Sequence, residues 1–399
     1  MRMWILTNRN RIVNMLFYVA LTIELVLMIV EKSEIHISFE SYVFRVTFLL
    51  TFLAVLFMKH DRKEWLFIAA IWAVSAVSYF ICGKNDMLRV VTLMMAARDI
   101  DLKKAMKYTF YVCAVGFMAI VLLACAGILG DIINAYDYGR GIENEARYVF
   151  GFGHPNTLFS SFFVLILMWI WIYGRTAGIL PYVVMLVSSA VITFLTRSRT
   201  SALILTVTVL LAIVFRLFPK LAETKVVYCI ETIVSPAFCT VLAILAAGWA
   251  GNMYAGDKFW DLGDAYWKIE SLFNYRMSPI YYDAENRDAI LSKWRLFSAH
   301  GTDSYFDMGW VRLFYWYGII PVAILIIALL AVIYICYKKK DIWTLLIIFS
   351  LSVYTIVEAT FVTRYLGRDF FLLIAGVYLG YYFTNKGELD VGKIKKETV

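Results

Sequence analysis

HPNTLFSSFFVLILMWIWIY, residues His154 to Tyr173, decides the fold class of this chain. The part from Asn156 to Tyr173 carries no charged residue and is long enough to cross the ~30 Å hydrocarbon core of a bilayer as a helix. Similar apolar runs recur along all 399 residues, which are 62% hydrophobic and only 17% charged. Because lipid offers no partner to exposed backbone groups, these spans must be helices. The sequence therefore predicts an all-α polytopic membrane protein.

The apolar runs predict twelve membrane spans, of which the fourth is short and could be re-entrant or tilted. They lie at residues 13–30, 42–58, 65–82, 86–97, 107–128, 156–173, 178–195, 201–217, 229–249, 308–335, 342–361 and 368–384. Two connections are long, at residues 130–155 and 251–307, and the second is expected to be partly helical. We therefore divide the chain into spans 1–9 (1–249), a large loop (250–307) and spans 10–12 with a tail (308–399).

Basic residues are distributed unevenly among the predicted connections. Lysines dominate the set that includes both termini, whereas arginines dominate the opposite set. Positive charge accumulates on the cytoplasmic side, so both termini are predicted to be cytoplasmic. The arginine-rich side then faces outward, where guanidinium groups could bind phosphate oxygens bidentately. The alternative is that these arginines are solvated or paired with the acidic residues of the same loops.

Several common chemistries have no counterpart in the sequence. The six cysteines lie within or beside apolar runs and form no CxxC pair, which is typical of small buried residues. The chain contains no GxxxxGK[ST] loop and no HExxH motif, so we expect no metal and no cofactor. No large cytoplasmic domain is predicted that could bind a nucleotide. A reaction would therefore depend on an activated substrate outside the membrane, or on a gradient.

The first candidate motif is RYVFGFGHPN, which contains Arg147, His154 and Asn156. Pro155 suits the first turn of a helix, because its missing N–H group would have no intrahelical partner there. His154 would then lie beside free N–H groups at the positive end of the helix dipole. Ordinary capping by His154 or Asn156 is the simpler alternative.

The second motif, LTRSRTSALIL, is a very short connection between two spans and contains Arg197 and Arg199. Ser198 or Thr200 could cap the following helix, which would place Arg199 at its N-terminus. Backbone N–H groups together with a guanidinium make a good phosphate site. Arginines that extend toward the membrane interface are the alternative interpretation.

Three further segments carry polar residues on the predicted outer side. LFNYRMSPIYY contains Arg276, and AHGTDSYFDMGWVRLFYWYGIIP contains His300, Asp307 and Arg312. The last outer turn, VEATFVTRYLGRDFF, adds Glu358 near the outer edge of the bilayer. An acidic residue within a membrane segment is a functional candidate and needs a basic partner. The basic residue nearest in sequence among the candidates is Arg364.

Taken in order, these motifs resemble those of the Wzy-type bacterial polysaccharide polymerases, which act in capsule, exopolysaccharide and O-antigen synthesis. The resemblance covers residues 147–368 approximately, together with the span count and the late outer loop. It implies the GT-C-like fold of the O-antigen polymerases and ligases. It also implies a metal-independent glycosyltransferase on the outer face of the cytoplasmic membrane. Such an enzyme transfers a growing glycan from undecaprenyl pyrophosphate to a lipid-linked repeat unit.

The resemblance also implies roles for individual residues. Arg199 and Arg276 match arginines that hold the pyrophosphate in the related ligases. Asp307 takes the place of a ligase histidine, so Asp307 or nearby His300 could be the base, or no formal base is needed. The remaining candidates are substrate contacts: Arg147, His154, Asn156, Arg197, Arg312, Glu358 and Arg364.

The expected partners are the bilayer and lipid-linked oligosaccharides, with flippase and chain-length regulator proteins as candidates and no nucleic acid. A ligase of the same superfamily is an alternative that the motifs hardly separate from a polymerase. A flippase or another transporter is the alternative of a different class. A transporter should place its polar residues near the bilayer midplane and show related halves. In this sequence the polar residues gather at the predicted outer edge and no internal repeat is evident.

Overall fold

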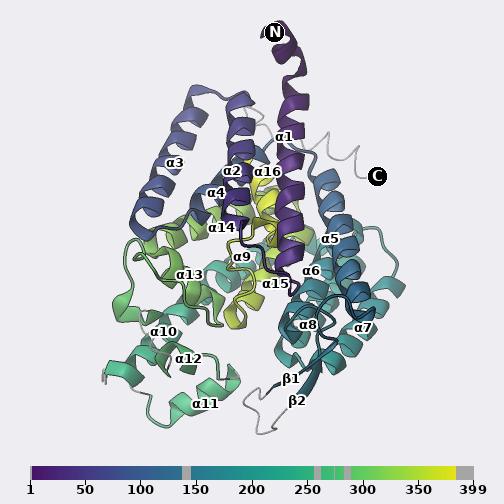
Figure 1. Ribbon diagram of the computed structural model, residues 1–399, viewed down its shortest axis with the longest axis vertical. Coiled ribbons are helices and arrows are strands. Elements are labelled where there is room, and N and C mark those ends of the chain that lie inside the picture. Colours follow the sequence, from purple (N-terminus) through teal and green to yellow (C-terminus); the bar gives the residue numbers. More distant parts are fainter. Residues whose placement is uncertain (1, 137–144, 256–261, 274, 283–288, 383–399) are drawn as a thin grey trace.

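The computed structural model describes residues 2–136, 145–255, 262–273, 275–282 and 289–382, which form helices and one antiparallel hairpin (Figure 1). The first half contains α1 (Arg2–Glu31), α2 (Glu40–Phe57), α3 (Arg62–Cys82), α4 (Asp86–Ala96), α5 (Leu102–Cys125), β1 (Ile133–Tyr136), β2 (Glu145–Tyr148), α6 (Pro155–Tyr173) and α7 (Leu180–Thr196). Next come α8 (Arg199–Leu217), η1 (Pro219–Glu223), α9 (Lys225–Thr232), the π-helix η2 (Ile233–Phe238), α10 (Cys239–Ala255), α11 (Ala265–Leu272) and α12 (Ser278–Tyr282). The last elements are η5 (Leu291–Lys293), α13 (Gly309–Tyr317), α14 (Ile319–Lys339), α15 (Ile342–Val357), η6 (Leu366–Arg368) and α16 (Phe371–Gly380).

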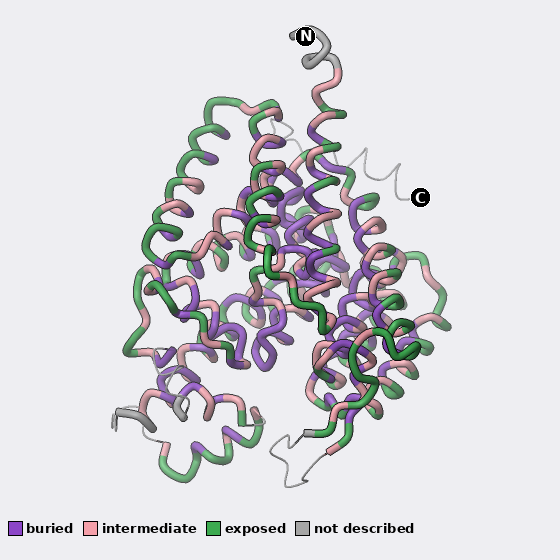
Figure 2. Tube along the Cα trace, viewed as in Figure 1, coloured by how far each residue is buried: buried purple, intermediate pink, exposed green. Residues whose placement is uncertain are grey.

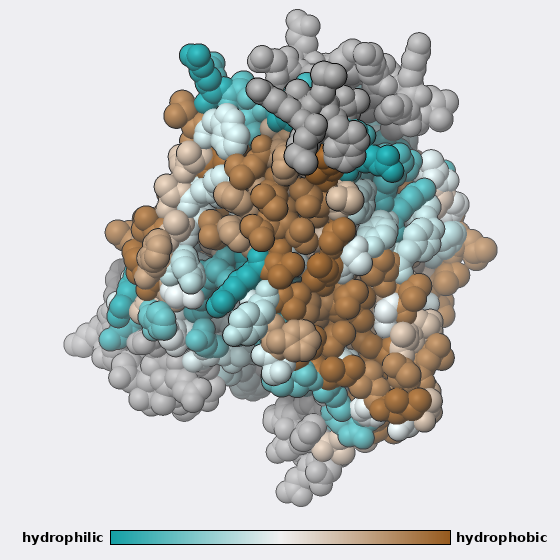
Figure 3. All heavy atoms as spheres, turned by 45° about the horizontal axis from the view of Figure 1, so that its top comes forward, coloured by the Kyte–Doolittle hydropathy of each residue, from teal (hydrophilic) through white to brown (hydrophobic). Residues whose placement is uncertain are grey.

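Eight helical segments of the described residues are long and apolar enough to cross a membrane. They are Asn8–Glu31 of α1, then α2, α3, α5, α6, α8, the continuous segment Lys225–Asn252, and α14. Shorter apolar helices are α7, α15 and α16, and the short fourth predicted span is the 11-residue helix α4. Large apolar side chains remain exposed on these helices, and Figure 3 shows them over a broad area of one face. The chain is therefore a multi-pass membrane protein.

The predicted span 308–335 is wrong as a single helix, because the chain breaks at Gly318 between α13 and α14. Gly318 has φ +95°, and a Cβ there would lie 2.6 Å from the Cα of Phe297. The backbone N–H of Ile319 donates to the carbonyl of Arg295 (2.9 Å), so the preceding loop replaces helical hydrogen bonds. Positive φ is readily adopted only by glycine, which is why the break occurs at this residue.

The predicted span 229–249 is longer than expected and contains a π-helical turn. Pro236 lies inside this turn, at η2, between α9 and α10. Proline cannot donate a backbone hydrogen bond, and π-turns commonly accommodate such defects within a helix. The whole segment Lys225–Asn252 nevertheless remains long and apolar enough to span a membrane.

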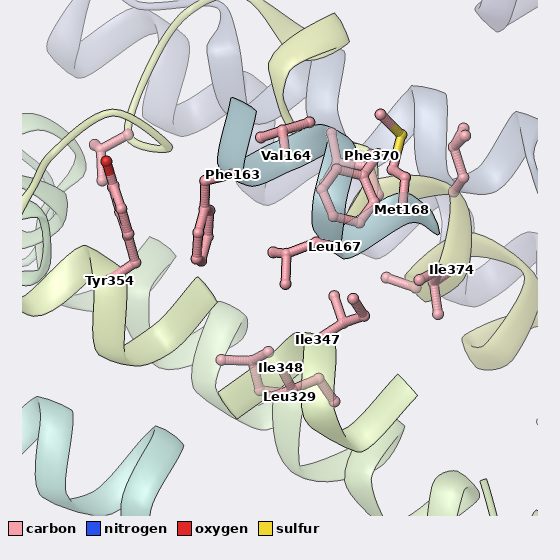
Figure 4. Close-up of a cluster of buried hydrophobic side chains, with 14 of the residues drawn as sticks. Phe163, Val164, Leu167, Met168, Leu329, Ile347, Ile348, Tyr354, Phe370 and Ile374 are labelled. Atoms are coloured by element: carbon pink, nitrogen blue, oxygen red, sulfur yellow. The ribbon is translucent and has the colours of Figure 1, made fainter. Parts of the chain in front are cut away.

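Helix α15 forms the centre of the molecule and is buried along nearly its whole length. Its side chains Ile347 and Ile348 pack among residues of α6, α14 and α16, as shown in Figure 4. Tyr354 stacks on Phe163 of α6 with ring centroids 4.7 Å apart. The buried parts of the chain lie along this central axis in Figure 2. An all-apolar helix is typical of a core position, and it fixes where Glu358, the next residue, must lie.

The molecule has two distinct ends. At the terminal end, where α1 begins and α16 ends, Asn10, Lys59, Arg98 and Tyr381 line a common cavity of about 520 Å³. The opposite end, which we call the site end, carries β1, β2, α11 and α12 (Figure 1). The hairpin at the site end pairs Asn134 with Arg147.

Candidate functional site

The N-terminus of α6 delivers the first two polar groups of the site. His154 is the N-cap residue, and its Nδ1 accepts the backbone N–H of Asn156 at 3.1 Å. Pro155 occupies the first helical turn, as the sequence predicted. The Asn156 side chain is thus free of capping, and it donates through Nδ2 to Glu358 Oε1 at 3.0 Å. Capping explains His154, whereas Asn156 points into a polar cluster.

The turn between α7 and α8 supplies a serine to the cluster and two arginines to the surface. Arg197 is the left-handed C-cap of α7 (φ 58°), and its guanidinium lies 5.0 Å from the ring of Phe194. Ser198 is buried and makes no capping bond; its Oγ donates to Asn156 Oδ1 at 2.7 Å. Arg199 begins α8 and is exposed. The two arginines therefore remain open to a ligand, while the serine between them fixes Asn156.

Arg276 lies between α11 and α12 and joins two carboxylates. Its Nη2 is 2.6 Å from Glu358 Oε1, and its Nη1 is 3.5 Å from Asp307 Oδ2. The Arg276 side chain is 11% exposed and that of Glu358 is 4% exposed, whereas Asp307 is 35% exposed. Asp307 is therefore the member that solvent or a substrate can reach. We call Asn156, Ser198, Arg276, Asp307 and Glu358 the Arg276 cluster.

The expected partner of Glu358 was Arg364, and the structure corrects this pairing. Glu358 is the C-cap residue of α15, where its extended backbone (φ −130°) ends the helix. It pairs with Arg276, 82 residues away in sequence. Arg364 instead lies 3.5 Å from Glu40, the first residue of α2. Because the chain turns away after α15, the neighbour in sequence is not the neighbour in space.

Arg312 of α13 holds the backbone beside the Arg276 cluster, and among the described residues no hydrogen bond or ion pair joins it to the cluster. Its side chain is completely buried and donates through Nη2 to the backbone carbonyls of Ala359 and Val362. The guanidinium also lies 3.9 Å from the ring centre of Tyr305. Arg312 thereby fixes the turn that follows Glu358, which gives it a positioning role.

His300 lies apart from the Arg276 cluster. Its ring packs against Gly83 at the end of α3, where an added Cβ would come within 2.6 Å of ring atoms. Among the described residues, no hydrogen bond or ion pair joins His300 to Arg276, Asp307 or Glu358. The geometry therefore favours Asp307 over His300 as a proton acceptor.

Arg147 extends the positive charge of the site onto the hairpin. It is buried in β2 and forms an ion pair with Glu145 at 2.5 Å.

The pKa of His154 is lowered from its ordinary value, first by desolvation and then by repulsion from Arg147 and Arg276, while Asp307 opposes this shift. The lowered pKa favours the neutral ring, and because Nδ1 accepts the Asn156 N–H, the ring proton lies on Nε2 and can be donated.

No sequence motif singles out Glu270, which holds the backbone that directly follows Arg276. Glu270 of α11 is fully buried and accepts the backbone N–H groups of Met277 (3.2 Å) and Ser278 (2.7 Å). It also accepts the Ser278 hydroxyl at 2.5 Å. The sequence signals of these contacts are an acidic residue six positions before Arg276 and a Ser-Pro pair after it.

The chemistry available to the cluster is anion binding and proton transfer. Arg276, together with exposed Arg197 and Arg199 and the first turns of α6 and α8, presents donors to an anion. Asp307 presents a partly exposed carboxylate 3.5 Å from the same guanidinium. Within the described residues, no group of three or more His, Cys, Asp or Glu is placed to hold a metal ion.

Comparison of the chain with protein-family models, with curated proteins and with solved structures finds no match. The interpretation of the site therefore depends on its residues and their geometry.

Proposed function

We propose that this protein is a polysaccharide polymerase of the bacterial cytoplasmic membrane. It transfers a growing glycan from undecaprenyl pyrophosphate to a lipid-linked repeat unit, with the site end facing outward and both termini in the cytoplasm. The proposal depends on one observation above all. Four motifs that are far apart in sequence contribute Asn156, Ser198, Arg276 and Asp307 to a single cluster, which is joined by hydrogen bonds and ion pairs through Glu358 and Arg276.

In this proposal the donor pyrophosphate occupies the space between the Arg276 cluster and the N-terminus of α8. Negative charge grows on the pyrophosphate as it leaves, and preorganised guanidinium groups stabilise such charge directly. Arg199 is exposed and free to contact the donor, whereas Arg276 is held by Asp307 and Glu358. The two carboxylates thus keep Arg276 oriented until the donor arrives.

The acceptor hydroxyl attacks the anomeric carbon of the donor sugar. A bond forms between the acceptor oxygen and this carbon, and the bond from the carbon to the phosphate oxygen breaks. The hydroxyl proton passes to Asp307, the most exposed carboxylate of the cluster, and undecaprenyl pyrophosphate leaves. No bond to a metal or nucleotide is involved in these steps.

The ligase alternative uses the same donor and differs only in the acceptor. The transporter alternative would need the polar residues to line a path through the membrane. In favour of an enzyme, the Arg276 cluster lies where α6 and α8 begin and where α15 ends, at one end of the bundle.

The test is chain extension by the purified, lipid-reconstituted protein given undecaprenyl-pyrophosphate-linked repeat units. We expect a ladder of products that stay attached to undecaprenyl pyrophosphate, and we expect Arg199→Ala and Arg276→Ala to reduce it strongly. Arg175→Ala is the matched control, since Arg175 is also exposed but follows α6 at its other end. Normal extension by Arg199→Ala and Arg276→Ala would refute the assignment. Chains found only on a different acceptor would indicate a ligase.

A further inference from the structure

A second polar cavity, which the sequence analysis did not identify, adjoins the Arg276 cluster. We call it the α1–α2 cleft, because residues 31–37 and 40 of the α1–α2 connection form one wall. The other walls are formed by Asp303, Tyr305 and Trp316, by Phe152 and Thr157, and by Thr360, Val362–Tyr365 and Arg368. Its volume of about 630 Å³ lies in the range of ligand-binding pockets.

The cleft reaches the Arg276 cluster through neighbouring residues. Thr157 lines the cleft and follows Asn156, and Thr360 lines it two residues after Glu358. Tyr305 lines it two residues before Asp307. The cleft and the Arg276 cluster therefore share three short segments of chain, although no residue of the cluster itself lines the cleft.

The charges of the cleft disfavour a pyrophosphate. Its lining contains four carboxylates (Glu31, Glu34, Glu40 and Asp303) and three permanent cations (Lys32, Arg364 and Arg368). Both arginines are already paired, Arg368 with Glu31 and Arg364 with Glu40. A mixture of carboxylates and cations with a slight acidic excess suits hydroxyl groups, which both donate and accept hydrogen bonds.

Lys32 is the cation of the cleft that lacks an acidic partner. It is 2% exposed and donates to Ser161 Oγ at 3.1 Å. In the described part of the chain, no carboxylate lies within ion-pair distance of its Nζ. A buried ammonium has three protons to donate, and only one of them has a hydrogen-bond partner there. The Nζ also lies 5.6 Å from the ring centre of Phe117, so the ammonium is directed into the protein and offers a ligand at most its two remaining N–H groups.

An aromatic surface lies on the opposite wall. Tyr305 is 63% exposed, although its ring also stacks on the guanidinium of Arg312 at 3.9 Å. Trp316 is buried beside it, and its indole N–H donates to the Ser304 carbonyl at 3.1 Å. A fixed aromatic face next to hydrogen-bonding groups can bind a molecule with an apolar face and polar edges, such as a sugar ring.

We propose that the α1–α2 cleft binds the sugar residues of the acceptor repeat unit, with Lys32 and Glu34 as polar contacts and Tyr305 as the stacking surface. That the bound sugar is the acceptor rests on the proposed function. Binding of a saccharide in the cleft can be measured without turnover. The cleft would set which repeat unit is extended, because it holds the sugars beside Asp307.

The test is equilibrium dialysis of the full-length protein against the repeat-unit oligosaccharide released from its lipid and pyrophosphate. His36→Trp places a large side chain in the cleft from an exposed position, so it should block binding and leave the fold intact. Ser38→Trp is the control, because Ser38 is exposed in the same connection but does not line the cleft. Lys32→Met should weaken binding about tenfold by removing a charged hydrogen-bond donor.

Three binding results would overturn the inference. The first is no oligosaccharide binding by wild type, and the second is equal binding by wild type and His36→Trp. The third is loss of inorganic pyrophosphate binding, rather than oligosaccharide binding, in Lys32→Met, which would indicate a phosphate site. Failure of the proposed function looks different: the cleft would bind oligosaccharide while the protein extends no chain. Conversely, chain extension with an unchanged acceptor KM in His36→Trp would contradict the cleft alone.

Discussion

Arg89 and Arg276 each lie between two carboxylates at nearly the same distances, but their surroundings differ. Arg89 is 2.8 Å from Glu24 and 3.6 Å from Asp86, and its side chain is only 2% exposed. Its guanidinium also stacks on the ring of Phe44 at 3.7 Å. We call these groups the Arg89 cluster, together with Thr47, whose hydroxyl donates to Glu24 at 2.5 Å. Both carboxylates of this cluster are largely buried: Glu24 is 1% exposed and Asp86 is 11% exposed.

The Arg276 cluster has the same composition but an open side. Its distances are 2.6 Å to Glu358 and 3.5 Å to Asp307, whose carboxylate is 35% exposed. The Arg89 cluster links α1, α2 and α4, and its more exposed carboxylate, Asp86, is only 11% exposed. The comparison teaches that an ion pair alone does not mark a site, whereas an ion pair with one reachable member can. It predicts that equivalent substitutions will affect stability in one cluster and activity in the other.

Replacing each arginine by alanine should give the largest contrast. Arg276→Ala should lower the chain-extension rate about a thousandfold, because charge on the leaving pyrophosphate loses a preorganised donor. Arg89→Ala should instead destabilise the fold by about 3–5 kcal/mol, since it leaves Glu24 buried and unpaired. Thermal unfolding and extension rate per folded protein measure the two effects. An equal fall in extension rate per folded protein in both variants would refute the distinction.

Neutralising the second carboxylate should have the next largest effect. Asp307→Asn should lower kcat about a hundredfold with little change in donor KM, because the variant cannot accept the hydroxyl proton. Asp86→Asn, the matched change in the Arg89 cluster, should leave kcat unchanged. A kcat near that of wild type in Asp307→Asn would remove Asp307 as the base.

The sequence predicted the members of the Arg276 cluster better than their pairing. Arg276, Asp307, Glu358 and Asn156 were all identified from their position at the predicted outer edge. Their contacts were not, because the pairing of Glu358 depends on how the end of α15 meets a loop 82 residues earlier. Sequence distance favoured Arg364, whose side chain is directed by the turn after α15 toward the α1–α2 connection.

The fold, like the site, was predicted where it depends on composition and was not predicted where it depends on contacts between distant residues. Run length identified the apolar helices, but it could not locate the break at Gly318, which depends on contact with Phe297. The Arg89 cluster was not predicted either, because the sequence around a charged residue in an apolar run does not indicate its ion-pair partner on another helix. The α1–α2 cleft combines residues from four distant segments, and no motif marks it.

Removing the charge of the buried carboxylate Glu358 should have smaller effects, which strengthen pyrophosphate inhibition but slow the reaction. Glu358→Gln can still accept from Asn156, but it no longer neutralises Arg276. Inhibition by inorganic pyrophosphate should therefore strengthen about fivefold, which corresponds to roughly 1 kcal/mol. The rate should fall about tenfold, since Arg276 loses its fixed orientation. Glu24→Gln should lower the melting temperature and leave pyrophosphate inhibition as it is; weaker inhibition in Glu358→Gln would contradict the charge argument.

The smallest expected contrast concerns the hydroxyl groups that orient each cluster. Ser198 donates to Asn156 at 2.7 Å, and Asn156 in turn donates to Glu358. Ser198→Ala should slow chain extension about fivefold, the value of one neutral hydrogen bond of roughly 1 kcal/mol. Thr47→Val removes the corresponding hydroxyl from the Arg89 cluster and should lower the melting temperature by about 2 °C at unchanged rate. If Thr47→Val slowed extension as much as Ser198→Ala, then even the closed cluster would be coupled to the reaction.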